Sequence, residues 1–423
     1  MNSTQIQRRN KRALLLIYIA NTVSGFAQGI SMLAIPWHFA RQNLTAEFNI
    51  YYAVITFLTL AWSPNAGAIV DRFNRKGVFL STNLIEGLVV SVVAILGAYS
   101  GSLPTFLIVL VFFITVLGYH IHYPNLYAFA QEITPPGRYT SVASSLEVVG
   151  QATSIGSGVI GAILLEGATY RIPWAFSSTG TLEIVIPQWE IWDIFAMDGL
   201  TYGVSIILII LIQYTPIKTR KVERGSLIKR LKTGFRYLQQ HPHILVFGLC
   251  AYAAFVNILV MLHALLPSYV KHHLQSDGTL LGLHELVAAT GALMAGGFAK
   301  RLFNRFNKTS VVIFFLCTTS FAYLSLSFTT SSTIFLIMGF IIGFANSGAR
   351  VYRVSYVMGK VPNEVIGRTN SVLTIGNTIM RGLFISLFTL PFFATKQVSH
   401  AYVVLGLFTF VAALILLINY KRF

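Results

Sequence analysis

Long apolar blocks are the feature that most constrains how this chain folds. Each block has roughly 20 to 28 residues, enough to cross about 30 Å of hydrocarbon as a helix rising about 1.5 Å per residue. Backbone groups in lipid must bond to one another, so each block is expected to be a helix. The expected spans are 13–40, 46–70, 76–99, 103–131, 139–165, 193–213, 243–270, 279–302, 308–328, 332–359, 366–392 and 397–420. The sequence therefore predicts an all-α polytopic membrane protein with twelve transmembrane helices.

Composition and charge agree with this fold class. Of the 423 residues, 55% are hydrophobic and 11% charged, whereas a soluble domain is about 25% charged. Most of the 31 lysines and arginines lie in the two termini and in every second loop. The positive-inside rule then predicts cytoplasmic termini and an even number of spans. The net charge of +17 therefore indicates contact with membrane lipids and not with nucleic acid.

An internal repeat divides the chain. Phe-Asn-Arg occurs at 73–75 and again at 303–305, and Gly-Arg occurs at 137–138 and 367–368, with the same offset of 230 residues in both cases. The sequence therefore predicts two pseudo-symmetric six-helix halves in parallel orientation, 1–213 and 243–423. Repeats of this kind place a substrate site near the bilayer midplane, between the halves.

The connections also carry signals. A basic linker, 214–242, is expected to join the halves on the cytoplasmic side. It contains an amphipathic helix, and the apolar residues of one face are Leu227, Ile228, Leu231, Phe235 and Leu238. In the loop 166–192, the alternating sequence TLEIVIPQWEIW predicts a short hairpin.

One loop resembles a family signature. Pro64-x-x-Gly67-x-x-x-Asp71-Arg72-x-x-Arg75-Lys76 is similar to the loop between the second and third helices of the major facilitator superfamily. With Val361-Pro362-Asn363-Glu364-x-x-Gly367-Arg368-x-Asn370-Ser371, it resembles the branch of macrolide-efflux and enterobactin-export proteins. The resemblance implies a secondary transporter of the bacterial inner membrane. The segment 157–162 lacks the proline of the family's antiporter motif, which weakens the case for drug/proton antiport.

The same resemblance implies a gate. Gly67 would let the second helix approach a helix of the other half closely, and Asp71 would face the N-terminal end of a helix. Arg72 and Arg75 would pair with acids such as Glu132. The alternative is that these charges only set the orientation in the membrane.

Three arginines inside apolar blocks are the main substrate-binding candidates, because charge at membrane depth is costly and seldom faces lipid. Arg381 is expected near the midplane, and Arg350 and Arg353 share one face of the tenth span. Such a cationic cavity favours an anionic substrate, which guanidinium groups bind by bidentate contacts. Alternatively, Arg353 reaches the cytoplasmic surface, and Arg381 only neutralises Glu147.

Neutral groups complete the predicted substrate site. The repeat places His120 opposite Arg350 and Tyr123 opposite Arg353. Gln28 of the first span and Asn257 of the seventh lie almost at the repeat offset and are expected to contact substrate. They are equally suited to bridge helices by hydrogen bonds. His120 and His122 point to different sides of a helix, so no metal site is expected.

Proton coupling requires a carboxyl group, because one buried in a membrane can exchange a proton near neutral pH. Glu147 is the preferred candidate because it is well inside the fifth span. Glu86, Asp198 and Glu285 are also candidates, although a structural role is favoured for each.

Motifs of enzymes are missing: the sequence has no Gly-x-Ser-x-Gly, no phosphate-binding Gly-x-x-x-x-Gly-Lys and no His-Glu-x-x-His. The prediction is a monomeric secondary transporter without a cofactor, which exports a siderophore-like organic anion or amphipathic metabolite by proton-coupled alternating access. The alternatives are multidrug or macrolide efflux, uptake of the same anions, and a transporter-like receptor without turnover.

Overall fold

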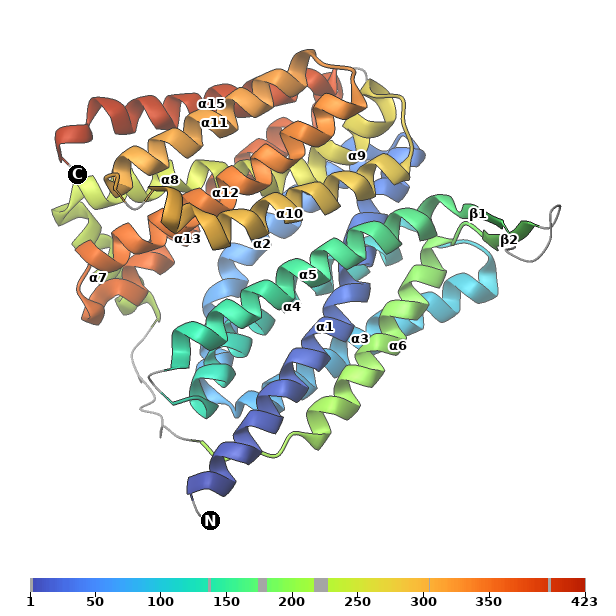
Figure 1. Ribbon diagram of the computed structural model, residues 1–423, viewed down its shortest axis with the longest axis horizontal. Helices are drawn as coiled ribbons and strands as arrows, with labels where there is room; N and C mark the ends of the chain where they lie inside the picture. The colour runs from blue at the N-terminus through green and yellow to red at the C-terminus, as the bar shows by residue number, and fades with distance from the viewer. Residues whose placement is uncertain are drawn as a thin grey trace. The chain divides into compact units, whose positions relative to one another are not determined.

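The computed structural model describes residues 3–135, 138–173, 181–216, 227–303, 305–394 and 397–422 (Figure 1). Long helices account for most of this part of the chain. They are α1 Ser3–Arg41, α2 Thr45–Arg72, α3 Arg75–Ser100, α4 Thr105–Ile133, α5 Tyr139–Glu166, α6 Ile191–Leu211, α8 Pro242–Val260, α10 Gly278–Phe303, α11 Lys308–Phe328, α12 Ser332–Lys360, α13 Asn363–Leu387 and α15 Val398–Ile418. Two antiparallel strands, β1 Ala168–Pro173 and β2 Thr181–Ile186, form the hairpin expected between the fifth and sixth spans.

Eleven helical segments of the described residues are long and apolar enough to cross a membrane. The eleventh predicted span, 366–392, is not among them. Its helix α13 has 25 residues, but it carries Asn370, Asn377 and Arg381. The helix also ends at Leu387, and a short helix α14, Pro391–Ala394, follows. Pro391 has no backbone N–H to continue α13, so the break lies where the chemistry requires it.

The seventh span departs from a regular α-helix. After α8 the chain forms two π-helical turns, η2 Met261–Leu265 and η3 Tyr269–His273, around the short helix α9 Leu266–Ser268. Pro267 lies between the two π-helical turns. Proline cannot donate a backbone hydrogen bond, and π-helical turns are frequent at functional positions.

Short polar residues determine where several helices begin. The side chain of Asn74 accepts hydrogen bonds from the backbone N–H groups of Lys76 and Gly77 and so caps α3. Asn307 caps α11 through Thr309 in the same way. The C-terminus of α3 ends at Gly101, whose φ of 68° is the left-handed conformation that glycine adopts without strain.

The contacts divide the chain into two compact units, and each is described by itself. Unit 1 comprises Met1–Phe39, Ala66–Arg220 and Ser276–Leu286, and unit 2 comprises Ala40–Asn65, Lys221–Gln275 and Val287–Phe423. Most of α2 therefore packs with the later helices, and the start of α10 packs with the earlier ones. In unit 1, a core cluster including Ile17, Phe79, Phe129 and Ile209 joins α1, α3, α4 and α6.

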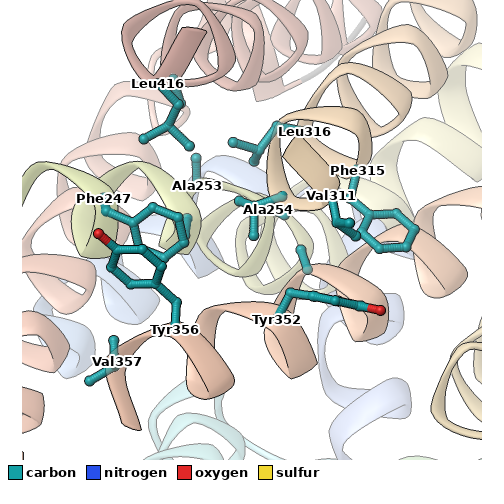
Figure 2. Close-up of a cluster of buried hydrophobic side chains, with 14 of the residues drawn as sticks. Phe247, Ala253, Ala254, Val311, Phe315, Leu316, Tyr352, Tyr356, Val357 and Leu416 are labelled. Carbon is teal, nitrogen blue, oxygen red and sulfur yellow. The ribbon is translucent and has the colours of Figure 1, made fainter. Parts of the chain in front are cut away.

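The core of unit 2 lies among α8, α11, α12, α13 and α15 (Figure 2). Phe247 and Tyr356 stack with ring centroids 3.7 Å apart. Ala253 and Ala254 of α8 are fully buried beside Leu316 and Leu416. Small residues on α8 let the neighbouring helices come close, which is how membrane helices gain packing energy.

The predicted amphipathic linker helix is α7, Leu227–Gln240. Its Leu238 is fully buried, whereas Phe235 is 49% exposed. A Cβ at Gly234 would meet the backbone of α13 at Arg368 and Thr369. The helix therefore packs against protein on part of its apolar face. The preceding linker residues, 217–226, lie outside the described residues.

One cation of unit 2 caps the end of α1. Lys271 Nζ donates hydrogen bonds to the carbonyl oxygens of Ala40 and Arg41, at 2.8 and 2.6 Å, and to Asn43 Oδ1 at 3.3 Å. A positive charge is stabilising at a helix C-terminus because the last carbonyl groups have no partner in the helix.

Candidate functional site: a buried carboxyl cluster

A carboxyl cluster, comprising Gln28, Ser31, Glu86, Asp198 and Tyr202, lies inside unit 1. The Tyr202 hydroxyl of α6 donates a hydrogen bond of 2.6 Å to Glu86 Oε2 of α3. Gln28 Nε2 of α1 donates to the Tyr202 oxygen at 2.7 Å and lies 3.5 Å from Glu86 Oε2. Three helices that are distant in sequence are thereby joined at one carboxyl group.

The second carboxyl group of the cluster is that of Asp198. Ser31 Oγ of α1 donates a hydrogen bond of 2.8 Å to Asp198 Oδ2. Asp198 is 0% exposed, and its Oδ1 has no hydrogen-bond partner among the described residues. Asp198 also lies one turn from Tyr202 on α6 and interacts electrostatically with Glu86.

Small residues allow this arrangement. A Cβ at Gly118 of α4 would collide with the Glu86 carboxyl group, so that group lies directly against the α4 backbone. A Cβ at Gly87 would lie 2.7 Å from the Tyr202 Cβ, and one at Gly199 would collide with Ser91. Glycine at these positions brings α3 close to α4 and α6.

The charge balance of the cluster is unusual. Glu86 is 6% exposed, and in the described part of the chain no lysine or arginine pairs with it or with Asp198. All hydrogen-bond donors to the two carboxyl groups are neutral side chains. Two carboxylates repel each other at low dielectric, so such a pair is suited to hold and exchange a proton.

The preferred proton-coupling residue of the sequence analysis, Glu147, lies on α5, but its side chain is outside the described residues. Glu285 lies on α10, where its Cβ would be 2.8 Å from a Cβ at Gly158 of α5. Glu285 Oε1 is buried without a hydrogen-bond partner in the part of the chain that the structure describes. Glu86 and Asp198 are the acids that the structure brings together.

The predicted gating residues are only partly united. Arg75 Nε lies 3.8 Å from Glu132 Oε2, an ion pair between the start of α3 and the end of α4. Arg72 is exposed, and the Asp71 side chain lies outside the described residues. No described atom lies within 4 Å of a Cβ at Gly67. The close helix approach expected at Gly67 is therefore not formed in this structure.

Of the predicted substrate residues in unit 1, Gln28 belongs to the carboxyl cluster. His120 Nδ1 lies 2.9 Å from the Val116 carbonyl oxygen of its own helix. Tyr123 is 51% exposed and contacts the rings of Tyr119 and His122, with centroids 5.6 Å away in both cases. These side chains do not converge on one point.

In unit 2, Arg353 is satisfied within its own bundle. Its guanidinium carbon lies 3.7 Å from the centroid of the Tyr252 ring, and Nη1 donates a hydrogen bond of 3.3 Å to the Ala251 carbonyl. Arg353 is 7% exposed. Arg350, one turn away on α12, is half-buried. Asn257 donates to the Leu405 carbonyl at 2.8 Å and so bridges α8 to α15.

Arg381 has different surroundings. It is half-buried, its Nε has no hydrogen-bond partner among the described residues, and it interacts electrostatically with Tyr52 and His263. The rings of Tyr52 and His263 meet edge to face, with centroids 5.7 Å apart. Since His263 lies on the π-helical turn η2, the irregular backbone of the seventh span helps to form this group.

Sequence reasoning named Glu86 and Asp198 singly but missed their association. The signal available was a glycine next to each acid, Gly87 and Gly199, on spans three and six. Small residues beside an acid indicate that another helix passes close to it. Among the described residues, no group of three His, Cys, Asp or Glu side chains is placed to hold a metal.

Comparison with known proteins agrees with the helical architecture. Residues 17–385 match the Major Facilitator Superfamily. Macrolide efflux protein A of Streptococcus pyogenes is 22% identical over 383 residues, which cover 88% of this chain and 87% of that protein. Macrolide efflux protein A of Enterococcus faecalis is 22% identical, covering 77% of this chain and 97% of that protein.

Solved structures share the fold at low identity. A point mutant of the nucleoside transporter NupG superposes with a TM-score of 0.72 at 9% identity, covering 97% of this chain and 100% of that one. The D-xylose-proton symporter superposes with a TM-score of 0.67 at 14% identity, covering 96% and 97%. The helices, the match over most of the length and these structures lead to one conclusion: the chain belongs to the Major Facilitator Superfamily and is a multi-pass membrane transporter, not an enzyme.

Proposed function

We propose that this transporter exports a macrolide, or an amphipathic compound of similar chemistry, in exchange for protons. The observation that carries the proton coupling is the carboxyl cluster, in which Glu86 and Asp198 are buried with only neutral donors. The named macrolide-efflux relatives support the substrate class. The bacterial inner membrane, cytoplasmic termini and a monomeric state remain part of the proposal.

The hydrogen bonds suggest how a proton acts on the helices. With one proton shared between the acids, the cluster carries a single negative charge, and the Tyr202 and Gln28 bonds hold α1 against α3 and α6. Loss of that proton leaves two carboxylates that repel each other. We propose that this change alters the packing of α1 and biases the halves 1–213 and 243–423 between two states.

Proteoliposomes test the coupling directly. Purified protein is reconstituted, a lumen more acidic than the outside is imposed, and uptake of radiolabelled erythromycin is measured. Protein-free liposomes correct for passive trapping of this weak base. Wild-type protein is expected to accumulate erythromycin above that background. Glu86→Gln and Asp198→Asn are expected to lose the pH-driven accumulation, while erythromycin exchange without a pH gradient persists.

Glu47→Gln is the matched control, since Glu47 also accepts a tyrosine hydrogen bond, from Tyr51 at 3.0 Å, but lies outside the carboxyl cluster. It is expected to transport like wild type. Accumulation that survives in both Glu86→Gln and Asp198→Asn would contradict the proposed coupling. Glu147→Gln and Glu285→Gln then identify whether another acid carries the proton.

Export of a siderophore-like organic anion is the second candidate, and Arg381 favours it. A half-buried guanidinium beside Tyr52 and His263, with Nε unpartnered among the described residues, is suited to bind an anionic group. A thermal-shift comparison of citrate, a tricatecholate chelator and erythromycin discriminates the two functions. Stabilisation by the anions that disappears in Arg381→Ala supports anion transport, and stabilisation by erythromycin alone excludes it.

A further inference from the structure

A small cavity lies beside the carboxyl cluster, inside unit 1. Its volume is about 10 Å³, and its polar lining residues are Asn21 of α1, Asn83 of α3, His122 of α4 and Ser205 of α6. Roughly 10–15 Å³ is the least that holds one water molecule, and a buried water needs two or more polar partners. The cavity meets both requirements for a single water.

Asn83 points to occupancy. It is 3% exposed, and its Nδ2 donates to the Phe79 carbonyl of its own helix at 2.8 Å. Its Oδ1 is buried and has no hydrogen-bond partner among the described residues. A buried acceptor without a partner costs about 1–3 kcal/mol, so a donor at this position is strongly favoured. Water in the cavity supplies one.

His122 provides the proton-carrying group. Its Nε2 lies 2.8 Å from Asn21 Oδ1, which accepts the hydrogen bond. The neutral ring then has Nδ1 as its free acceptor, so a proton arriving from water binds at Nδ1. The ring also packs edge to face on Phe79, with centroids 5.3 Å apart, which limits its rotation.

The cavity and the carboxyl cluster follow one another along the same four helices. Asn83 is three residues from Glu86, Ser205 three from Tyr202, and Asn21 seven from Gln28. These separations correspond to about 5–10 Å along a helix axis and keep the side chains on one face. In each helix the cavity residue is nearer the end of the bundle that carries the N-terminus of α1. The titratable groups around the path are Glu86, Tyr119, His122, Tyr123, Asp198 and Tyr202.

We propose that this cavity binds a water molecule that relays the coupling proton between Glu86 and His122. The carboxylic O–H of Glu86 gives its proton to the water, which passes one of its own protons to Nδ1 of His122. Water is restored, and the imidazolium then releases a proton toward the N-terminal end of α1. The inference rests on the proposed function and adds to it a path through the interior of the helix bundle.

Stopped-flow proton release tests the relay. Purified protein in weak buffer is mixed with erythromycin, and a pH-indicator dye records the amplitude and rate of release. Asn83→Leu removes the orphan acceptor, and Ala20→Val fills the cavity without removing any polar side chain. Both are expected to release the same amount of proton at least about tenfold more slowly than wild type. His122→Phe is expected to behave likewise, with the rate recovering in millimolar azide, a diffusible weak acid.

Asn65→Leu is the matched control. Asn65 Nδ2 donates to the Ala61 carbonyl at 2.8 Å, the same own-helix bond as in Asn83, but Asn65 does not line the cavity. Wild-type release in this control assigns any slowing to the cavity. Erythromycin-induced thermal stabilisation of each variant verifies folding, and Ala20→Val decides the result where Asn83→Leu does not fold.

Two failures are distinguishable. Release of the full proton by both Glu86→Gln and Asp198→Asn would refute the proposed function itself. Loss of the proton in those variants, together with wild-type rates in Asn83→Leu and Ala20→Val, would overturn the relay alone.

Discussion

Two buried charges, one in each unit, show opposite ways of placing an ionisable group inside a membrane. The guanidinium of Arg353 in unit 2 lies over the Tyr252 ring and bonds to the Ala251 carbonyl. Glu86 in unit 1 has a tyrosine and a glutamine as partners and a second acid as its charged neighbour. A charge with complete partners can remain ionised and hold helices together. Two acids without a cation can be accommodated only by binding a proton, which is a property of a coupling site.

Supplying the carboxyl cluster with a cation is expected to have the largest effect. Gln28→Lys places an ammonium group beside Glu86, since the Gln28 amide nitrogen is already 3.5 Å from Glu86 Oε2. Separating a buried ion pair costs about 3–5 kcal/mol, so proton-driven erythromycin uptake should fall at least about 100-fold. Thermal stability should be unchanged or higher. Gln28→Met is the uncharged control, and uptake by Gln28→Lys equal to that of Gln28→Met would contradict the prediction.

A steric change at the same acid is expected to have the next largest effect. Gly118→Ala puts a Cβ where the Glu86 carboxyl group lies and forces it to move. Overpacking of this kind costs about 1–3 kcal/mol, and pH-driven uptake should fall about tenfold. Gly150→Ala on α5 is the control, because no described atom lies within 4 Å of its Cβ. Equal transport by the two variants would show that the position of the carboxyl group is not critical.

Arg353→Met tests the other side of the comparison. Removing the guanidinium should lower the free energy of unfolding by about 1–3 kcal/mol, through the lost cation–π contact and hydrogen bond. Erythromycin transport per folded molecule should be nearly unchanged. Arg353→Lys should lose less stability, because it keeps the charge but not the planar stacking. Full stability with loss of transport would return Arg353 to the substrate site that its sequence position suggested.

The smallest effect is expected where charge meets a helix end. Lys271→Met removes the cation at the carbonyl groups of Ala40 and Arg41. The free energy of unfolding should fall by about 1 kcal/mol or less, since charge–dipole contacts of this kind are weak. Lys271→Arg should retain most of it. Thermal denaturation in low and high salt measures the difference, which salt should diminish; a larger loss than in Arg353→Met would reverse the order.

Much of the fold could be predicted from local patterns. The predicted span 308–328 coincides with α11, and 103–131 differs from α4 by two residues at each end. The hairpin and the amphipathic linker helix were also predicted, and the family assignment is confirmed by the match over residues 17–385. Hydropathy within a single helix is sufficient for these features, because each apolar block must satisfy its own backbone in lipid.

The partners of each polar side chain were decided by tertiary structure. Gln28 was expected at the substrate, but it bonds to Glu86 and Tyr202. Arg353 was expected to bind an anion, but it has an aromatic ring and a carbonyl group of α8 as partners. Such pairings depend on the rotation and depth at which helices from distant parts of the chain pack. Contacts such as Gly118 against Glu86 determine that packing. The sequence by itself therefore determined the helices, their order and the family, and only the packing of those helices decided which buried charges are paired and which must share a proton.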